Sequence, residues 1–363
     1  MILYKSKENI KGDSHRAIKR RINMKKIRVF EAFSGYGSQS IALENIGIPH
    51  EVVAISEIDK YAIQGYEAIH GETNNLGDIS KIRVEDIPEH DLFTYSFPCQ
   101  DISTAGAMRG LKKGETRSGL LYECKKIIEH CKPKYLLMEN VKNLVGKKFR
   151  EQFDAWLDYL ESLGYTNYWQ ILNAKDYNIP QSRERVFVVS ILGEHKPYKF
   201  PEGFKLDKNI KSLLEYNVDN KYYLSDEVVK KFVPNKNFTT KIVKDSNNDP
   251  KIVTVGFIKK SENGTKHQSN TVIDEDYLMR TLAACDYKSP QLIIVKDNIG
   301  GSETGFKIRK ITPKECFRLM GLSDDNTHKI IDSGISATQQ YKMAGNSIVI
   351  QVLEEIFKNL FLS

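Results

Sequence analysis

The sequence predicts an α/β protein with a parallel main sheet and helices on both faces, followed by a second, smaller and irregular domain. Two observations support this. Short apolar runs alternate with helical stretches over the first 192 residues, and beyond them the chain becomes rich in Lys, Asn, Asp and Tyr with weak periodicity. Alternating strands and helices favour parallel pairing, because each helix returns the chain to the same end of the sheet. A chain of 363 residues has room for two domains.

Each expected element follows from its pattern of apolar residues. Continuous apolar runs bounded by turn residues predict buried strands, and apolar residues at helical spacing predict helices. The expected strands span residues 27–33, 52–55, 92–97, 135–138 and 186–192. The expected helices span residues 41–46, 120–130, 149–163 and 347–361.

Composition excludes several classes of protein. With 40% hydrophobic and 28% charged residues, the bulk of the chain is neither disordered nor collagen-like. No apolar run approaches the ~18–20 residues of a membrane span, and the N-terminus lacks a secretory signal pattern. We therefore expect a cytoplasmic protein without a membrane partner. Five irregularly spaced cysteines predict neither a disulfide framework nor a metal site.

The net charge of +7 is unevenly distributed. Residues 1–28 hold ten Lys/Arg against two Asp/Glu, and residues 199–271 hold fourteen against nine. The two segments between and after them are mildly acidic. Basic segments of this kind can anchor phosphates, although a solvated surface is an equal alternative.

Ligands of parallel α/β sheets bind beyond the carboxyl ends of the strands, and the distinctive residues of this chain are expected there. Phe33-Ser34-Gly35-Tyr36-Gly37 follows the first strand, and Glu57 ends the second. Glycines allow a ligand to approach the backbone, and an acid about twenty residues later can bind ribose hydroxyls. The pair indicates an adenosine-containing cofactor, whereas the glycines alone fit a plain tight turn.

Further reactive residues follow the next strands. Cys99 comes directly after the third strand and before a Gly-rich, basic loop, residues 101–119, typical of a mobile lid. Glu139 ends the fourth strand, where a helix cap is the alternative role. Arg183 and Arg185, two residues apart on an extended chain, are expected to point towards one site unless they form a surface pair. A lone cysteine is otherwise a small buried hydrophobe.

Taken in order, these motifs resemble the C5-type DNA cytosine methyltransferases, bacterial or phage type, over about residues 27–357. The motifs that carry the resemblance are Phe33-Ser34-Gly35-Tyr36-Gly37, Pro98-Cys99-Gln100, Glu139-Asn140-Val141, Gln181-x-Arg183-x-Arg185, Arg280-Thr281-Leu282 and Gly345-Asn346-Ser347. Two positions depart from the pattern. Glu31 stands where the family usually has Asp, and Ile58 stands where an aromatic residue is common.

The resemblance implies a Rossmann-like S-adenosylmethionine-dependent methyltransferase fold with a target-recognition domain. It implies transfer of a methyl group to carbon 5 of a cytosine flipped out of a specific double-stranded DNA sequence. Cys99 would add to C6 as a thiolate, Glu139 would act at N3, Arg185 would hold O2, and Arg183 would order the loop beside it.

The resemblance also implies two sets of binding residues. The residues expected to bind S-adenosylmethionine are Phe33, Ser34, Gly35, Tyr36, Gly37, Glu57, Ile58, Asp78, Ile79, Pro98, Leu120, Asn346 and Ser347. The residues expected to bind DNA are Gln100, Ser103, Arg109, Lys112, Lys113, Arg117 and Arg280. We expect a monomer that acts in a bacterial cell or a phage-infected host. A cognate restriction endonuclease is a candidate partner, but we expect no stable complex with it.

Three rival functions remain open from the sequence alone. The same chemistry on tRNA is the closest, because a small branch of the family methylates tRNA, but the basic segment before Arg280 is longer than that branch's compact insert. A non-catalytic DNA-binding protein would have no reason to keep the reactive residues. A nicotinamide-dependent reductase would need a fuller dinucleotide motif than this chain has.

The expected domains are a basic arm at residues 1–23, a catalytic domain at 24–195, a target-recognition domain with hinge at 196–334, and a C-terminal segment at 335–363 that returns to the catalytic domain. The arm is too short and polar to bury a core. Recognition of the target sequence is expected to depend mainly on residues 199–271.

Deletion of residues 1–23 tests the arm. These residues carry seven Lys/Arg against two Asp/Glu. We expect turnover at saturating DNA to be unchanged and DNA affinity to become less salt-dependent, by about 0.9 in the slope of log K for each phosphate that the arm neutralises. DNA affinity of the full chain and of protein starting at Met24 is measured across a salt series. If log K falls with salt at the same slope for both proteins, the arm does not bind DNA. If the shortened protein loses turnover, the arm belongs to the catalytic fold.

Overall fold

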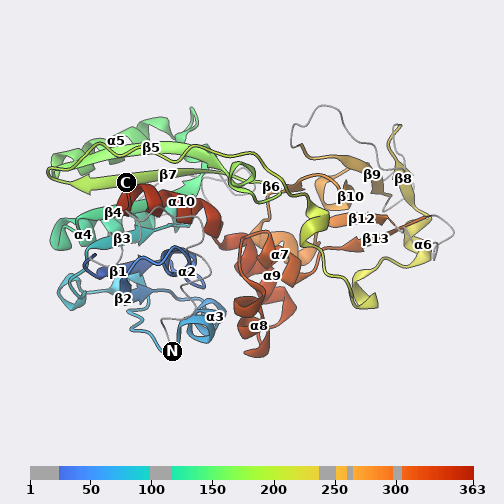
Figure 1. The fold of residues 1–363 in the computed structure, drawn as a ribbon, viewed down its shortest axis with the longest axis horizontal. Helices are drawn as coiled ribbons and strands as arrows, with labels where there is room; N and C mark the ends of the chain where they lie inside the picture. Colours follow the sequence, from blue (N-terminus) through green and yellow to red (C-terminus); the bar gives the residue numbers. More distant parts are fainter. Residues whose placement is uncertain (1–23, 99–116, 237–250, 260–264, 297–304) are drawn as a thin grey trace. The chain divides into compact units, whose positions relative to one another are not determined.

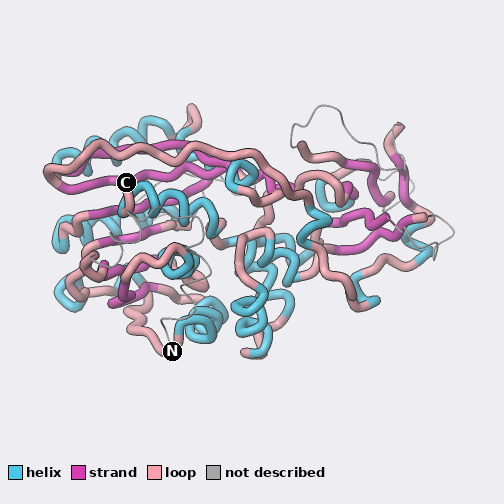
Figure 2. Tube along the Cα trace, viewed as in Figure 1, coloured by secondary structure: helices cyan, strands magenta, loops and turns pink. Residues whose placement is uncertain are grey.

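The computed structural model describes residues 24–98, 117–236, 251–259, 265–296 and 305–363. The basic arm lies outside the described residues. The chain divides into two compact units (Figures 1 and 2). The first comprises Met1–Leu172, Glu184–Glu202 and Ile348–Ser363, and the second comprises Asn173–Arg183 and Gly203–Ser347.

These units differ from the expected domains at three places. Residues 196–202 group with the first unit, although the target-recognition domain was expected to begin at 196. Residues 173–183 leave the first unit, although the sequence suggested continuity as far as 195. The expected C-terminal segment is split, because residues 335–347 group with the second unit and only Ile348–Ser363 groups with the first.

The first unit is built on a six-stranded sheet with the strand order β2-β1-β3-β4-β7-β5. Its strands are β1 (Ile27–Ala32), β2 (His50–Ser56), β3 (Leu92–Tyr95), β4 (Tyr135–Val141), β5 (Tyr165–Asn173) and β7 (Glu184–Leu192). Its helices are α2 (Ser38–Asn45), α3 (Lys60–His70), α4 (Leu121–Cys131), α5 (Arg150–Ser162) and α10 (Ile350–Phe361).

Strands β1 to β4 pair in parallel, as predicted. Strand β1 lies between β2 and β3, and β4 follows β3, so their carboxyl ends share one edge of the sheet. Strand β7 instead runs antiparallel to β4. All five expected strands are present, and helix α3 and strand β5 were not predicted.

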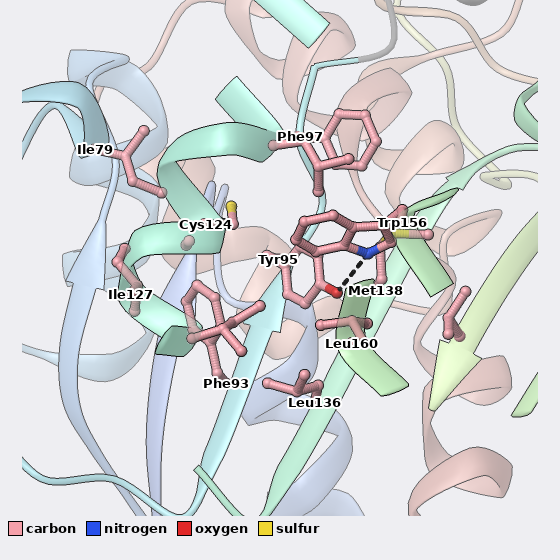
Figure 3. Close-up of a cluster of buried hydrophobic side chains, with 14 of the residues drawn as sticks. Ile79, Phe93, Tyr95, Phe97, Cys124, Ile127, Leu136, Met138, Trp156 and Leu160 are labelled. Carbon is pink, nitrogen blue, oxygen red and sulfur yellow. Dashed lines mark hydrogen bonds between the residues drawn. The ribbon is translucent and has the colours of Figure 1, made fainter. Parts of the chain in front are cut away.

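A buried hydrophobic cluster joins one face of the sheet to helices α4 and α5. Phe93 and Tyr95 of β3 lie in it with Cys124 of α4 and Trp156 of α5 (Figure 3). The indole N–H of Trp156 donates to the Tyr95 hydroxyl at 3.3 Å, so these two polar groups satisfy each other inside the cluster. The apolar side chains that predicted these strands therefore form the core beneath the carboxyl ends of β3 and β4.

Side chains on the opposite face meet other helices. The ring of Tyr135 on β4 contacts Phe361 of α10, with the ring centroids 5.2 Å apart. Glu31 of β1 is fully buried and accepts a hydrogen bond at 3.2 Å from the hydroxyl of Tyr66 on α3. This burial raises the pKa of Glu31 to about 7, since a charged carboxylate loses its hydration there.

The second unit contains more regular structure than its polar composition suggested. A five-stranded sheet has the order β13-β12-β10-β9-β8, and β6 pairs with β11. The strands are β6 (Gln181–Ser182), β8 (Phe232–Pro234), β9 (Thr254–Ile258), β10 (Thr271–Asp274), β11 (Met279–Arg280), β12 (Leu292–Lys296) and β13 (Phe306–Lys310). The helices are α6 (Asp226–Val229), α7 (Pro313–Arg318), α8 (Asp324–Asp332) and α9 (Ala337–Asn346).

A buried ion pair connects β13 to α7 in the second unit. The Arg309 guanidinium donates to both carboxylate oxygens of Glu315, at 2.8 and 2.6 Å. Glu315 also accepts from the backbone N–H of Thr312, which caps α7. Removal of either charge would leave the other buried and unpaired, so the pair fixes where α7 begins. None of the helices in the described segments is long and apolar enough to cross a membrane.

Glu31 gives a pH-dependent stability prediction. The pKa of its carboxyl is near 4.5 in the unfolded chain and about 7 in the folded protein, so the folded state holds the proton more tightly. The stability of the wild type relative to Glu31→Gln should therefore fall as pH rises from about 4.5 to 7, by up to about 3 kcal/mol. Urea unfolding of both proteins across this pH range measures the difference. A difference that does not change with pH would show that Glu31 titrates alike in both states.

Candidate functional site

The loop after β1 has an unusual backbone. Phe33, Gly35 and Gly37 all have positive φ, at 56°, 58° and 82°. For Phe33 this conformation costs on the order of 1 kcal/mol, because its Cβ crowds the backbone. Ser34 O accepts from Gly37 N at 3.0 Å, so the segment is also a tight turn. Strain that the fold maintains at a strand end is typical of functional loops.

Helix α3 packs against this loop. A Cβ at position 37 would lie 2.4 Å from His70 Nε2 and 2.7 Å from the Tyr66 ring, so only glycine fits there. His70 Nε2 lies 3.2 Å from the Tyr36 carbonyl oxygen. Helix α3 was not expected from the sequence, yet its side chains determine how closely the loop can approach it.

Glu57 connects the loops that follow β1 and β2. Its carboxylate accepts from the backbone N–H groups of Gly35 at 3.0 Å, Ile58 at 2.8 Å and Asp59 at 2.9 Å. A carboxylate has about four acceptor positions, so three bonds leave capacity for a hydroxyl donor. The predicted ribose-binding acid is therefore held in a fixed position next to the predicted cofactor loop.

Asn75 holds the same turns and was not among the residues predicted from the sequence. Its Oδ1 accepts from Glu57 N at 3.2 Å and from Gly77 N at 3.0 Å, and its Nδ2 donates to Glu57 O at 3.1 Å. Asn75 thus joins the Glu57 turn to the Gly77-Asp78 turn. Its only sequence signal was its place in the Asn74-Asn75 pair before Gly77, which looks like an ordinary loop.

Asp78 and Ile79 have clear structural roles. Asp78 caps a short 3-10 turn by accepting from the backbone N–H and hydroxyl of Ser80, and these bonds hold the pKa of Asp78 below its usual range. Ile79 is buried in the hydrophobic cluster beside α4. Leu120 packs against the same cluster, and Pro98 is partly exposed beyond β3.

Two observations in this region fit S-adenosylmethionine. Ser34 Oγ is buried and has no hydrogen-bond partner among the described residues. Its hydroxyl could therefore form a hydrogen bond with a polar group of a ligand beside the loop. Ile58 follows Glu57 and is 71% exposed, an apolar surface available to a flat ring. A hydroxyl, a carboxylate and an apolar side chain match the amino-acid, ribose and adenine parts of that cofactor.

Glu139 and Arg185 form an ion pair at the end of β4. Arg185 Nε lies 3.1 Å from Glu139 Oε1, and the two side chains are 16% and 11% exposed. Arg185 is paired in register with Val141, which lies two residues beyond Glu139 and so on the same face of β4. Glu139 lies within the strand, so it is not the helix cap that the sequence left open.

Arg183 does not share this pair. It is 4% exposed, and its guanidinium donates to the carbonyl oxygens of Leu282, Gly345 and Ser347 at 2.8, 3.1 and 2.8 Å. The expectation that Arg183 and Arg185 face one site fails, because Arg183 separates β6 from β7 and regular alternation is interrupted there. Arg183 instead fastens segments of the second unit together.

The other predicted residues of the second unit are placed as follows. Arg280 is half-buried and bonds Thr271 Oγ1 and the Gln268 carbonyl oxygen. Asn346 is exposed at the end of α9, and the Ser347 hydroxyl donates to the Ala344 carbonyl oxygen. Gly345 must be glycine, because a Cβ would lie 2.4 Å from the Ala283 carbonyl carbon.

Several predicted residues cannot be placed. Cys99, Gln100, Ser103, Arg109, Lys112 and Lys113 lie outside the described residues, as does the side chain of Arg117. In the described segments no cluster of three or more His, Cys, Asp or Glu residues could hold a metal ion.

Comparison with known proteins agrees with this geometry. The model of the C-5 cytosine-specific DNA methylase family matches residues 27–362. The chain is 39% identical to the type II methyltransferase M2.ScrFI of Lactococcus lactis subsp. cremoris, over 93% of this chain and 99% of that protein. It is 30% identical to the orphan methyltransferase M.SPBetaI of Bacillus phage SPbeta, over 93% and 98%.

Solved structures support the same fold. The S. pombe Dnmt2 methyltransferase superposes with a TM-score of 0.65 at 20% identity, covering 92% of this chain and 97% of that one. Entamoeba histolytica EhMeth superposes with a TM-score of 0.69, also at 20% identity, covering 93% and 98%. The family model spans nearly the whole chain, and the site residues occur in the expected order. The chain therefore belongs to the C-5 cytosine-specific DNA methylase family and is a DNA (cytosine-5) methyltransferase.

Proposed function

We propose that this enzyme methylates carbon 5 of a cytosine that it flips out of a specific double-stranded DNA sequence, through a covalent bond between Cys99 and C6. The observation that carries the proposal is the Glu139–Arg185 pair, 3.1 Å apart at the end of β4. Strand β4 pairs with β3, and β3 leads by Phe97 and Pro98 to Cys99. The acid at the end of β4 and the guanidinium at the start of β7 thus lie together, and the proposed thiol follows in the chain that leaves β3, the other neighbour of β4.

Cys99 would start the reaction. Carbon 5 of cytosine is a poor nucleophile, and addition of a thiolate to C6 makes it enamine-like. C5 would then attack the methyl group of S-adenosylmethionine, and the electron pair of the broken S–CH3 bond would stay on sulfur. Loss of the C5 proton to a base and breakage of the S–C6 bond would restore the aromatic ring and the thiolate. The thiolate is the reactive form, so Cys99 would have to lose its proton before it adds to C6.

Glu139 and Arg185 would hold the cytosine ring. Negative charge develops on the ring as the thiolate adds, and a proton or hydrogen bond from the Glu139 carboxyl at N3 would offset it. The Arg185 guanidinium would donate to O2 of the cytosine. It would then have to divide its N–H groups between O2 and the Glu139 carboxylate, which it contacts in this structure. Both side chains are mostly buried, so their interactions with the base would be weakly screened by water.

S-adenosylmethionine, when bound, supplies an electrophilic methyl group on sulfur. Residues 33–37 would surround its amino-acid part and adenosine, and Glu57 would accept from its ribose hydroxyls. Ile58 would cover the adenine ring, with Asp78, Ile79, Pro98 and Leu120 completing the surroundings. Asn346 and Ser347 are proposed to close the same pocket.

DNA would be bound by both units. Gln100, Ser103, Arg109, Lys112, Lys113 and Arg117 would contact the strands around the extruded base, and Arg280 would contribute from the second unit. We further propose a monomer that acts in the cytoplasm of a bacterial cell or phage-infected host. The relatives include a type II and an orphan methyltransferase, so a companion endonuclease remains a proposal.

Substitution of the nucleophile tests the covalent step. Cys99→Ser should lower methyl transfer by about 1000-fold or more while DNA affinity stays close to wild type, because the recognition surfaces are unchanged. Duplex DNA carrying 5-fluorocytosine should trap the wild type covalently, since fluorine cannot leave C5 as the proton does. The adduct is counted on a denaturing gel.

Cys285→Ser is the matched control, because Cys285 is exposed in the second unit and should be dispensable. It should form the adduct at the wild-type rate. An adduct that persists in Cys99→Ser would show that another residue is the nucleophile. Preferential methylation of tRNA over duplex DNA would show that tRNA, and not DNA, is the substrate.

Segment exchange tests sequence recognition. Replacement of residues 196–285 by those of a relative with another target should move the methylation pattern to that relative's target, because base contacts rather than phosphate contacts specify sequence. Bisulfite sequencing of host DNA reads the pattern. An unchanged pattern would move specificity to another part of the chain, such as residues 101–119.

A further inference from the structure

Asn140, next to Glu139, has a role that the reaction scheme leaves open. Its side chain is 2% exposed. Its Nδ2 donates to the Phe97 carbonyl oxygen at 3.0 Å, and its Oδ1 accepts from Val141 N at 2.9 Å. Both ends of a single amide are thus used, one within β4 and one across to the chain that leaves β3.

The position of Phe97 explains why this bond matters. The parallel ladder between β3 and β4 ends at Tyr95 and Met138, and the ladder between β1 and β3 also ends at Tyr95. Phe97 lies two residues beyond both ladders. Strand β4 continues to Val141 through its pairing with β7, so Asn140 is still held in place there.

The Asn140 amide therefore supplies the hydrogen-bond donor that a neighbouring strand would give the Phe97 carbonyl oxygen inside the sheet. A backbone carbonyl that is buried without a donor is costly, and Nδ2 supplies the donor. Pro98 has no N–H and restricts Phe97 to extended conformations. The Phe97 ring is 2% exposed in the cluster with Tyr95 and Trp156 (Figure 3). Ring and carbonyl together fix the chain immediately before Pro98.

We propose that Asn140 is a positioning residue that, through the Phe97 carbonyl, sets the point from which the Pro98-Cys99 segment leaves the sheet. The inference rests on the proposed role of Cys99 as the nucleophile. Glu139 and Asn140 then act in different ways, since Glu139 pairs with Arg185 and Asn140 holds the chain that leads to Cys99.

Asn140→Asp tests this directly, because it keeps the size of the side chain and the acceptor for Val141 N. It replaces the Nδ2 donor by an oxygen that faces the Phe97 carbonyl. At pH 8 we expect the rate of covalent trapping on 5-fluorocytosine DNA, at saturating DNA and S-adenosylmethionine, to fall about 10- to 100-fold. At lower pH the introduced carboxyl becomes protonated and can donate its O–H to Phe97, so the ratio of variant to wild-type rate should rise.

Asn140→Ala is the second variant. It cannot donate in any protonation state, so its rate relative to wild type should be low and independent of pH. Asn167→Asp is the matched control in the same unit, because Asn167 Nδ2 also donates to a backbone carbonyl, that of Leu157 at 3.0 Å. It should trap within about two-fold of wild type, since Asn167 holds a carbonyl of α5 and not the chain that leads to Cys99.

Equilibrium affinities for DNA and S-adenosylmethionine and the melting temperature are measured for every variant. Unchanged affinities with a slower trapping rate, and recovery of Asn140→Asp alone at low pH, support the positioning role. A wild-type trapping rate in Asn140→Asp would overturn it, as would affinities that fall while the saturated rate is unchanged. No adduct with the wild type would overturn the proposed function and this inference together.

Discussion

The register between β4 and β7 is the constraint on which the proposed base-binding site depends. Because the two strands are antiparallel with Val141 opposite Arg185, Glu139 and Arg185 lie on the same face and meet diagonally at 3.1 Å. A slip of one residue would turn Arg185 to the other face and leave Glu139 without its partner. The apolar side chains of both strands oppose such a slip, because their burial sets which face is inside.

The proposed cofactor side of the site depends on a second set of fixed contacts. Glu57 receives three backbone N–H groups, and Asn75 joins the Glu57 turn to the next one. These bonds hold the loop after β1 in a conformation that is strained at Phe33. Preorganisation of this kind reduces the ordering that a ligand must bring about when it binds.

The sequence predicted the elements whose burial is strong and local. Each expected strand of the first unit is a short apolar run between turn residues, and each is present. Strand β5 lies at the edge of the sheet, and it was missed because Thr166, Asn167 and Gln170 interrupt its apolar residues, so it contains neither a continuous apolar run nor a regular alternation. The strands of the second unit were missed because they are two to five residues long and pair with distant partners, as β10 does with β12.

The contacts of individual side chains were predicted less completely than the places of the strands along the chain. Glu57 and Glu139 could be proposed as site residues because each ends a predicted strand. Arg183 was assigned to the wrong neighbours, since a two-residue spacing gives one face only where the strand is continuous. Asn75 makes three hydrogen bonds whose partners depend on the folded chain, so no local pattern identifies it. Asn140 belongs to a motif that the sequence analysis named, but its bond to the Phe97 carbonyl oxygen depends on the folded chain and was not predicted.

This site is proposed to methylate carbon 5 of cytosine in duplex DNA, and the position of the transferred methyl group is the sharpest test of that proposal. Duplex DNA of mixed sequence is incubated with the full chain and S-adenosylmethionine, hydrolysed to nucleosides and analysed by mass spectrometry against standards. We expect 5-methylcytosine as the product, and we expect Glu139→Gln to form no more than about one hundredth of the wild-type amount. Methyl groups on cytosine N4 or adenine N6, or wild-type yields from Glu139→Gln, would contradict it.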